Sequence, residues 1–155
     1  MNDPSLVRIV YASQIAAACL DDLSSVLDRI LTASIRNNRL RGITGLLIAH
    51  QGWFVQALEG PGGATHALFN DICADSRHSK AVLLGERAVD AREFGQWNMC
   101  ARQMSATDAK ILDELDGCAT FDPADLPERT VMRLLKTVAL AHHKALTQQQ
   151  SLAAA

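Results

Sequence analysis

The sequence predicts an α+β domain: a mixed sheet with two helices on one face, followed by two C-terminal helices. Short β-prone runs alternate with apolar residues at helical spacing, and Gly and Pro separate these segments. The chain has 155 residues, of which 48% are hydrophobic and 21% charged, which suits one core plus a small appendage. This composition excludes a disordered protein.

Charge and hydropathy argue against two classes of partner. Lys and Arg number 15 against 17 Asp and Glu, without a basic block, so we expect no nucleic-acid partner. No apolar stretch approaches the roughly 18 residues that span a bilayer, so we expect no membrane partner. Asp3 precedes the first apolar segment and Arg8 splits it, which is atypical of a secretion signal and favours a cytoplasmic protein.

The cysteines favour a structural role. Cys19, Cys73, Cys100 and Cys118 lie far apart, without a C-x-x-C pair or a nearby histidine cluster. We therefore expect buried free thiols, with neither a metal site nor a disulfide framework. A cysteine nucleophile is a weaker hypothesis because no companion histidine lies at a recognisable spacing.

The N-terminal segment predicts a strand followed by a helix. Residues 6–11 are β-prone, and we expect this strand to be central in the sheet. Asp21 and Asp22 are candidates for the start of a helix that ends near Asn37 and Asn38, before Gly42. Its apolar face comprises Leu23, Val26, Leu27, Ile30, Leu31 and Ile35.

The middle of the chain predicts a hairpin, a second helix and two strands. Apolar runs at 43–49 and 53–58 flank a tight connection, and residues 59–63 end the hairpin. The second helix has Ala64, Ala67, Leu68 and Ile72 on one face and stops near Arg77 and His78; strands at 81–84 and 97–101 follow. Right-handed crossovers place both helices on one face, which favours a ferredoxin-like arrangement.

The C-terminal third predicts a helical extension. A helix over 107–115 should end at Gly117, and a longer one follows Pro123 and Pro127 with a stripe of Val131, Leu134, Leu135 and Val138. We divide the chain into a domain over 1–104, a helical extension over 105–147 and a frayed tail over 148–155.

Several polar residues stand among apolar ones. Alternation along the second hairpin strand places Gln56 on one face with Phe54 and Leu58, so its amide needs partners inside the fold. Tyr11, the only tyrosine, lies on a strand expected to be buried and needs a polar companion. Each could be an ordinary core residue, and Asn37 and Asn38 could simply end their helix. Together they suit a planar, amide-rich ligand such as a flavin held between the two helices.

The order and spacing of six segments over residues 6–104 resemble the signatures of BLUF domains, the blue-light sensors that use FAD. The resemblance implies their ferredoxin-like fold, in short members with two helices after the sheet. The segments are Val10-Tyr11-Ala12-Ser13, Asn37-Asn38, Gly42-Ile43-Thr44-Gly45-Leu46-Leu47, Gly52-Trp53-Phe54-Val55-Gln56-Ala57-Leu58-Glu59-Gly60, Asp75-Ser76-Arg77-His78 and Arg92-Glu93-Phe94-Gly95-Gln96-Trp97-Asn98-Met99.

The resemblance also implies residue roles. Tyr11 would be the photochemical electron donor, Gln56 the amide that bridges Tyr11 to the flavin, and Asn38 the anchor of the pyrimidine edge of the ring. The Trp53-Phe54 pair is bulkier than the family often shows but leaves Gln56 in place. The other implied residues are Ser34 and Asn37 as polar contacts, Ile30 and Ile72 as apolar contacts to the ring, Arg77 and His78 toward the ribityl and phosphate, and Trp97 and Met99 in the signalling strand.

We therefore expect a photoreceptor without enzymatic activity that binds FAD, or alternatively FMN, non-covalently. Light would drive electron and proton transfer from Tyr11 and rearrange the hydrogen bonds of Gln56. The last strand and the C-terminal helices would signal to a separate effector protein or a homo-oligomer interface. Two alternatives stay open: a flavin-free interaction module, and a dark flavin oxidoreductase. No nicotinamide motif supports the oxidoreductase, and we expect His50 and His66 to face water.

Overall fold

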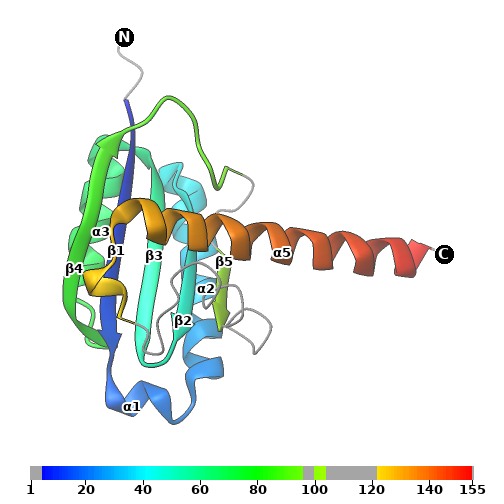
Figure 1. Cartoon of the computed structure of the whole chain (residues 1–155), viewed down its shortest axis with the longest axis horizontal. Coiled ribbons are helices and arrows are strands. Elements are labelled where there is room, and N and C mark those ends of the chain that lie inside the picture. The colour runs from blue at the N-terminus through cyan, green and yellow to red at the C-terminus, as the bar shows by residue number, and fades with distance from the viewer. Residues whose placement is uncertain (1–4, 96–99, 104–121, 155) are drawn as a thin grey trace.

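The protein forms one mixed sheet of five strands, seen in a computed structural model that describes residues 5–95, 100–103 and 122–154 (Figure 1). The strand order is β4-β1-β3-β2-β5, with β5 parallel to β2 and all other neighbours antiparallel. The α+β, ferredoxin-like prediction is confirmed. The strands are β1 (Leu6–Ile15), β2 (Thr44–His50), β3 (Trp53–Pro61), β4 (His78–Ala88) and β5 (Cys100–Gln103).

Helices cover both faces of the sheet and create two separate cores. On one face, α2 and α3 pack over Tyr11, Leu47 and Phe54, as predicted for two helices on one face. On the other face, α5 crosses the sheet over Val10 and Val55, and its C-terminal end projects beyond the strands (Figure 1). The helices are α1 (Ala17–Leu20), α2 (Leu23–Arg41), α3 (Gly62–Cys73) and α5 (Glu128–Ala154), with a 3₁₀ turn at Pro123–Asp125.

Helix α2 starts where the sequence predicted and ends later. Asp22 is its N-cap residue, but the helix continues past Asn37 and Asn38 to Arg41. It stops at Gly42, which has a φ of 71° and donates its backbone N–H to the carbonyls of Asn38 and Arg39. The left-handed conformation that ends the helix is adopted by glycine at no steric cost, so the prediction of an asparagine end was wrong.

The hairpin is confirmed, but its second strand extends beyond the predicted end. The turn uses Gln51 and Gly52, with φ of 48° and 83°. β3 continues to Pro61 because Glu59 is paired with both β1 and β2, and Gly60 and Pro61 are paired with β1. Helix α3 begins directly at Gly62. The predicted break at 59–63 was therefore wrong: cross-strand pairing outweighs the weak strand preference of glycine.

Helix α3 is shorter than predicted. It ends at Cys73, whereas the sequence analysis placed its end near Arg77 and His78. His78 is instead the first residue of β4, paired with Ile15 of β1.

The expectation of buried thiols was wrong for two cysteines. Cys73, the last residue of α3, is exposed, and Cys19, in the single turn of α1, is half-buried.

The C-terminal helix confirms the predicted apolar stripe, since Val131, Leu134, Leu135 and Val138 are all buried. The structure gives helix through Ala154 where fraying was expected from Gln148, consistent with the good intrinsic helix propensity of Ala, Gln and Leu. Trp97, Met99 and the predicted helix over 107–115 lie outside the described residues. Within the described part of the chain, no helix is long and apolar enough to cross a membrane.

Candidate flavin site

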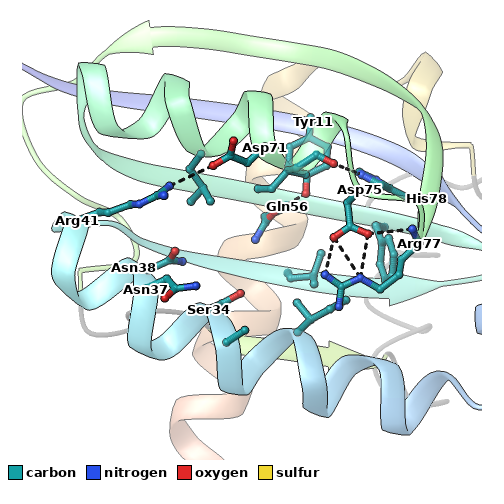
Figure 2. A pocket seen from close by; sticks show the side chains of 16 residues that line it. Tyr11, Ser34, Asn37, Asn38, Arg41, Gln56, Asp71, Asp75, Arg77 and His78 are labelled. Atoms are coloured by element: carbon teal, nitrogen blue, oxygen red, sulfur yellow. Dashed lines mark hydrogen bonds and ion pairs between the residues drawn. The ribbon is translucent and has the colours of Figure 1, made fainter.

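A cavity of about 230 Å³ lies between α2 and α3, above β1 and β3 (Figure 2). Every residue predicted to contact a cofactor lines it, although these residues come from five different elements and the loop before β4. The predicted set is Tyr11, Ile30, Ser34, Asn37, Asn38, Gln56, Ile72, Arg77 and His78. Lining residues that the sequence analysis did not assign are Ala33, Arg41, Leu47, Phe54, Leu68, Asp71 and Asp75.

Tyr11 and Gln56 form a hydrogen-bonded pair in the wall of this cavity. They are direct partners in the antiparallel register of β1 and β3, and the Tyr11 hydroxyl donates to Oε1 of Gln56. Both side chains are buried, and burial raises the pKa of Tyr11 well above its ordinary value, with Cys73 and Asp75 adding to the effect. Tyr11 therefore stays protonated and remains a donor to Gln56 across the physiological pH range.

Helix α2 contributes the polar side of the cavity. Ser34, Asn37 and Asn38 are three and four residues apart, which places them on one helix face. Asn38 is 1% exposed, whereas Asn37 lies at the surface. Amide and hydroxyl groups on this edge provide the donors and acceptors that the pyrimidine edge of an isoalloxazine requires.

Apolar side chains face each other across the cavity. Ile30 comes from α2, while Leu68 and Ile72 come from α3, and all three pack against the core beneath these helices. Two apolar walls and a polar edge suit a planar heteroaromatic ring inserted between the helices. The residues present therefore fit a flavin.

Ion pairs occupy two ends of the cavity (Figure 2). Arg77 Nε lies 2.9 Å and 3.1 Å from the two carboxylate oxygens of Asp75, and its Nη2 lies 2.5 Å from Oδ2. These hydrogen bonds lower the pKa of Asp75 and fix the Arg77 guanidinium in place. At the other end, Arg41 Nη1 lies 3.6 Å from Oδ2 of Asp71, and both side chains are exposed.

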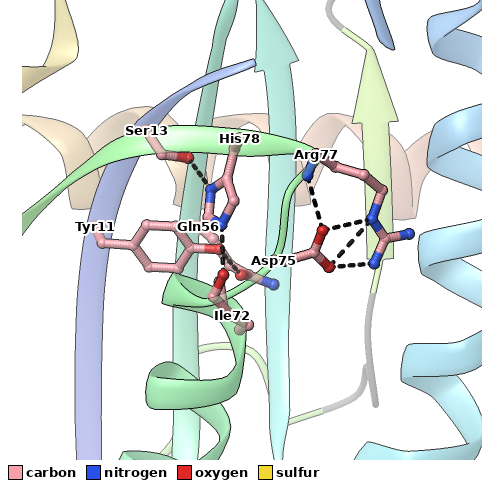
Figure 3. A network of polar contacts seen from close by, with 7 residues as sticks. All are labelled: Tyr11, Ser13, Gln56, Ile72, Asp75, Arg77 and His78. Carbon is pink, nitrogen blue, oxygen red and sulfur yellow. Dashed lines mark hydrogen bonds and ion pairs between the residues drawn. The ribbon is translucent and has the colours of Figure 1, made fainter. Parts of the chain in front are cut away.

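His78 ties α3 to the sheet beside Tyr11 (Figure 3). Its Nε2 lies 2.5 Å from the carbonyl oxygen of Ile72, which requires Nε2 to donate, and its Nδ1 lies 2.6 Å from Oγ of Ser13. Its ring meets that of Tyr11 edge-on at 6.4 Å, while the Phe69 ring contacts Tyr11 at 5.3 Å. The phenol is therefore held from two sides as well as by Gln56.

Arg41 was missed because the sequence prediction ended α2 near Asn37 and Asn38. Arg41 follows Asn37 and Asn38 at helical spacing, so a helix that continued to Gly42 would have placed it on the cavity face. Asp71 directly precedes Ile72 within α3, and Asp75 lies in the loop that follows the end of the helix at Cys73. Neither was assigned to the cavity from the sequence.

Comparison with known proteins supports one family. A family model described as BLUF, sensors of blue-light using FAD, matches residues 6–100. The chain is 34% identical over 122 residues to photoactivated adenylate cyclase subunit alpha of Euglena gracilis, and 30% identical over 94 residues to the blue light- and temperature-regulated antirepressor BluF of Escherichia coli K12. These alignments cover 76% and 61% of this chain, but only 12% and 23% of the respective relatives.

Solved structures give the same result over more of their length. BlsA in its photo-activated state matches with a TM-score of 0.76 and 30% identity, covering 85% of this chain and 93% of that one. BlrB, a BLUF protein in its dark state, matches with a TM-score of 0.69 and 31% identity, covering 87% and 98%. The similarity of fold and the match to the family model therefore indicate the same family.

Proposed function

The chain belongs to the BLUF family of blue-light sensors that use FAD, and from this premise we propose that Tyr11 and Gln56 carry its photochemistry. The matched family is one of flavin-binding sensors rather than enzymes. The observation that carries the proposal is the hydrogen bond from Tyr11 to Gln56 in the wall of a cavity whose other groups suit a flavin.

The proposed light reaction needs no diffusing reactant. A bound flavin, when excited, supplies a strong oxidant at the cavity wall. Tyr11 would donate one electron to the bound flavin and then its hydroxyl proton, along the hydrogen bond to Gln56, to the same flavin; both would return to Tyr11 on recombination. These transfers require a protonated Tyr11 hydroxyl, and burial keeps it protonated by raising the pKa of Tyr11.

What persists after recombination is a rearranged Gln56. Because amide rotation or tautomerisation exchanges donor and acceptor groups, Gln56 would then present a new donor to a bound flavin, at its C4 carbonyl. Stabilising charge at that carbonyl lowers the excitation energy and produces a small red shift. A hydrogen bond of this kind changes the free energy by about 1–3 kcal/mol, which shifts a two-state population without unfolding the domain.

The proposed ligand contacts follow from the cavity. Asn38 holds the pyrimidine edge with help from Asn37 and Ser34, and Ile30 and Ile72 enclose the ring. Arg77 and His78 are assigned to the ribityl and phosphate end of FAD, with FMN as the alternative ligand. Because both ring nitrogens of His78 bond to Ser13 and to the Ile72 carbonyl, His78 shapes this end of the cavity and Arg77 supplies its charge.

The proposed output lies beyond the cavity. We assign residues 1–104 to the photosensory unit, 105–147 to a C-terminal extension and 148–155 to its tail, with Trp97 and Met99 in the segment that responds to Gln56. A separate cytoplasmic effector protein, or a homo-oligomer of this chain, receives the signal. The names of two relatives, an adenylate cyclase subunit and an antirepressor, indicate that outputs differ between proteins with this module.

The test is the absorption spectrum of flavin-loaded protein in darkness and after blue illumination. Wild type should show a reversible red shift, while Tyr11→Phe and Gln56→Leu should bind flavin and lose the normal shift. Gln14→Leu on the same sheet, outside the cavity, is the matched control and should photocycle normally. Normal photocycling by both cavity variants would contradict the assigned roles.

Two further outcomes identify the alternatives. Protein that stays colourless after reconstitution with FAD would indicate a flavin-free interaction module. Rapid anaerobic bleaching by NADH in darkness would indicate an oxidoreductase.

A further inference from the structure

Glu59 is a completely buried carboxylate on the face of β3 opposite the flavin cavity. It is 0% exposed, and it shares its strand face with Val55 and Ala57, which belong to the core beneath α5. A buried charge is costly unless it is fully paired, so its partners indicate what it is built to hold.

The partners of Glu59 come from β1 and from the segment that follows β4. Arg8 Nε and Nη2 each lie 3.0 Å from Oε2 of Glu59. The backbone N–H of Glu93 donates to the same oxygen at 3.0 Å, and that of Phe94 donates to Oε1 at 2.7 Å. The carboxylate therefore accepts hydrogen bonds from two successive backbone amides, and the Arg8 guanidinium balances its charge.

Arg92 binds the same segment to α2, β2 and β3, the elements around the cavity. Its Nη1 donates to Oγ1 of Thr44 at 2.9 Å and to the carbonyl oxygen of Glu59 at 3.0 Å. Its Nη2 donates to the carbonyl oxygen of Gly42, the C-cap of α2, at 2.7 Å. Residues 92–94 are thus bound to the end of the helix that carries Asn38 and to the strand that carries Gln56.

Phe94 connects this segment to α5. Its side chain is 1% exposed and belongs to the core that contains Val131, Leu135 and Val138 of α5. One residue therefore has its backbone bound by Glu59 of β3 and its ring packed beneath the C-terminal helix. We call residues 92–94 with Glu59 and Arg8 the β3–α5 junction.

We propose that Glu59 is a positioning residue that couples Gln56 to α5 through the β3–α5 junction. Glu59 lies three residues after Gln56 on one paired strand, about 10 Å along it, so a change in the pairing of β3 displaces the carboxylate and with it Phe94. This inference rests on the proposed photochemistry of Tyr11 and Gln56. It adds to that photochemistry a path by which a change at Gln56 reaches α5 through the buried carboxylate of Glu59.

The test compares two readouts on the full, flavin-loaded chain. The light-minus-dark absorption spectrum reports the cavity, and amide hydrogen exchange of α5 in darkness and under blue light reports the output. Wild type should change the exchange of amides in 128–141 by at least about fivefold on illumination, the lower end of typical coupling between sites. Glu59→Gln should keep the red shift and lose this change, because its amide NH₂ would face the donors of Arg8 and Glu93.

Arg92→Ala is a second variant, in case Glu59→Gln does not fold: it removes the hydrogen bonds of a half-buried residue of the junction and leaves the Glu59 side chain unchanged. It should likewise keep the red shift and lose the α5 response. Glu93→Gln is the matched control: this exposed carboxylate lies 3.6 Å from Lys136 of α5, and only its backbone contacts Glu59. It should respond like wild type, because exposed ion pairs contribute little.

The outcomes separate this inference from the proposed function. Absence of a red shift in wild type overturns the photochemistry, and the inference with it. A red shift in wild type without a change in α5 exchange overturns the inference alone. The inference is also overturned if Glu59→Gln and Arg92→Ala keep the α5 response, because a merely structural Glu59 would lower thermal stability and leave the light-dependent change intact. Loss of flavin by both variants overturns it as well.

Discussion

The Tyr11 hydroxyl donates to Oε1 of Gln56 at a position where the two residues are direct partners across β1 and β3. The backbone register of the two strands therefore aligns the pair. Their side chains share the sheet face beneath α2 and α3, so a flavin between the helices would meet both.

Asn38→Ala should weaken FAD binding more than Asn37→Ala. Asn38 is buried in the cavity wall, so its loss leaves a buried ligand group without a partner, at a cost of about 1–3 kcal/mol. Asn37 is exposed, where water replaces the lost amide. Fluorescence titration of apoprotein with FAD measures both affinities, and equal losses would contradict the assignment of Asn38 as the anchor.

Arg77→Ala should weaken binding of FAD about tenfold and leave binding of riboflavin nearly unchanged. The reason is that a guanidinium at the phosphate end makes charge-assisted hydrogen bonds that riboflavin, lacking phosphate, does not need. Arg41→Ala, at the other end of the cavity, is the control and should affect both ligands alike. Selective loss of FAD binding in Arg41→Ala instead would place the phosphates at the opposite end.

Gly85→Ala should loosen the start of α5. A methyl group at Gly85 would overlap the carboxylate of Glu128, whose Oε2 lies 2.5 Å from Nη2 of Arg87. We expect a loss of about 1 kcal/mol in the free energy of unfolding, measured by urea denaturation. In a Glu128→Ala background the same substitution should cost almost nothing; an additive loss would show that the overlap is not its cause.

His66 should give the stability a pH dependence of defined sign. The hydrogen bond from His66 to Glu86 raises the pKa of the imidazole above its ordinary value of 6.5. The folded state thus binds the proton more tightly, so this contribution is present below pH 6.5 and is lost as the pH rises through the higher pKa of the folded protein. His66→Ala should flatten urea midpoints across this range, by a small amount because both side chains are exposed. An unchanged slope would contradict the assignment.

Much of the fold follows from local signals in the sequence. Alternation along 53–58 correctly separated Phe54 and Leu58 from Val55 and Ala57, because the two faces of β3 belong to different cores. Asp22 correctly marked the start of α2, where it is the N-cap residue although its side chain makes no capping hydrogen bond.

Several errors lie where distant parts of the chain decide. Pairing with β1 carries β3 through Gly60, and pairing with β1 makes His78 part of a strand. Neither pairing has a local signal. The sequence likewise did not indicate the burial of Glu59, which depends on the assembled fold. Arg41 was missed for a local reason, the early end predicted for α2.

The light-minus-dark infrared difference spectrum of flavin-loaded protein tests the role of Gln56, because it reports the C4 carbonyl of the ring and the amide of the protein together. Illumination should lower the C4 carbonyl frequency in wild type, and isotope labelling of glutamine should shift the accompanying amide bands. Both changes should vanish in Gln56→Leu. A carbonyl shift that persists in Gln56→Leu, or a visible red shift without any change at that carbonyl, would contradict that role.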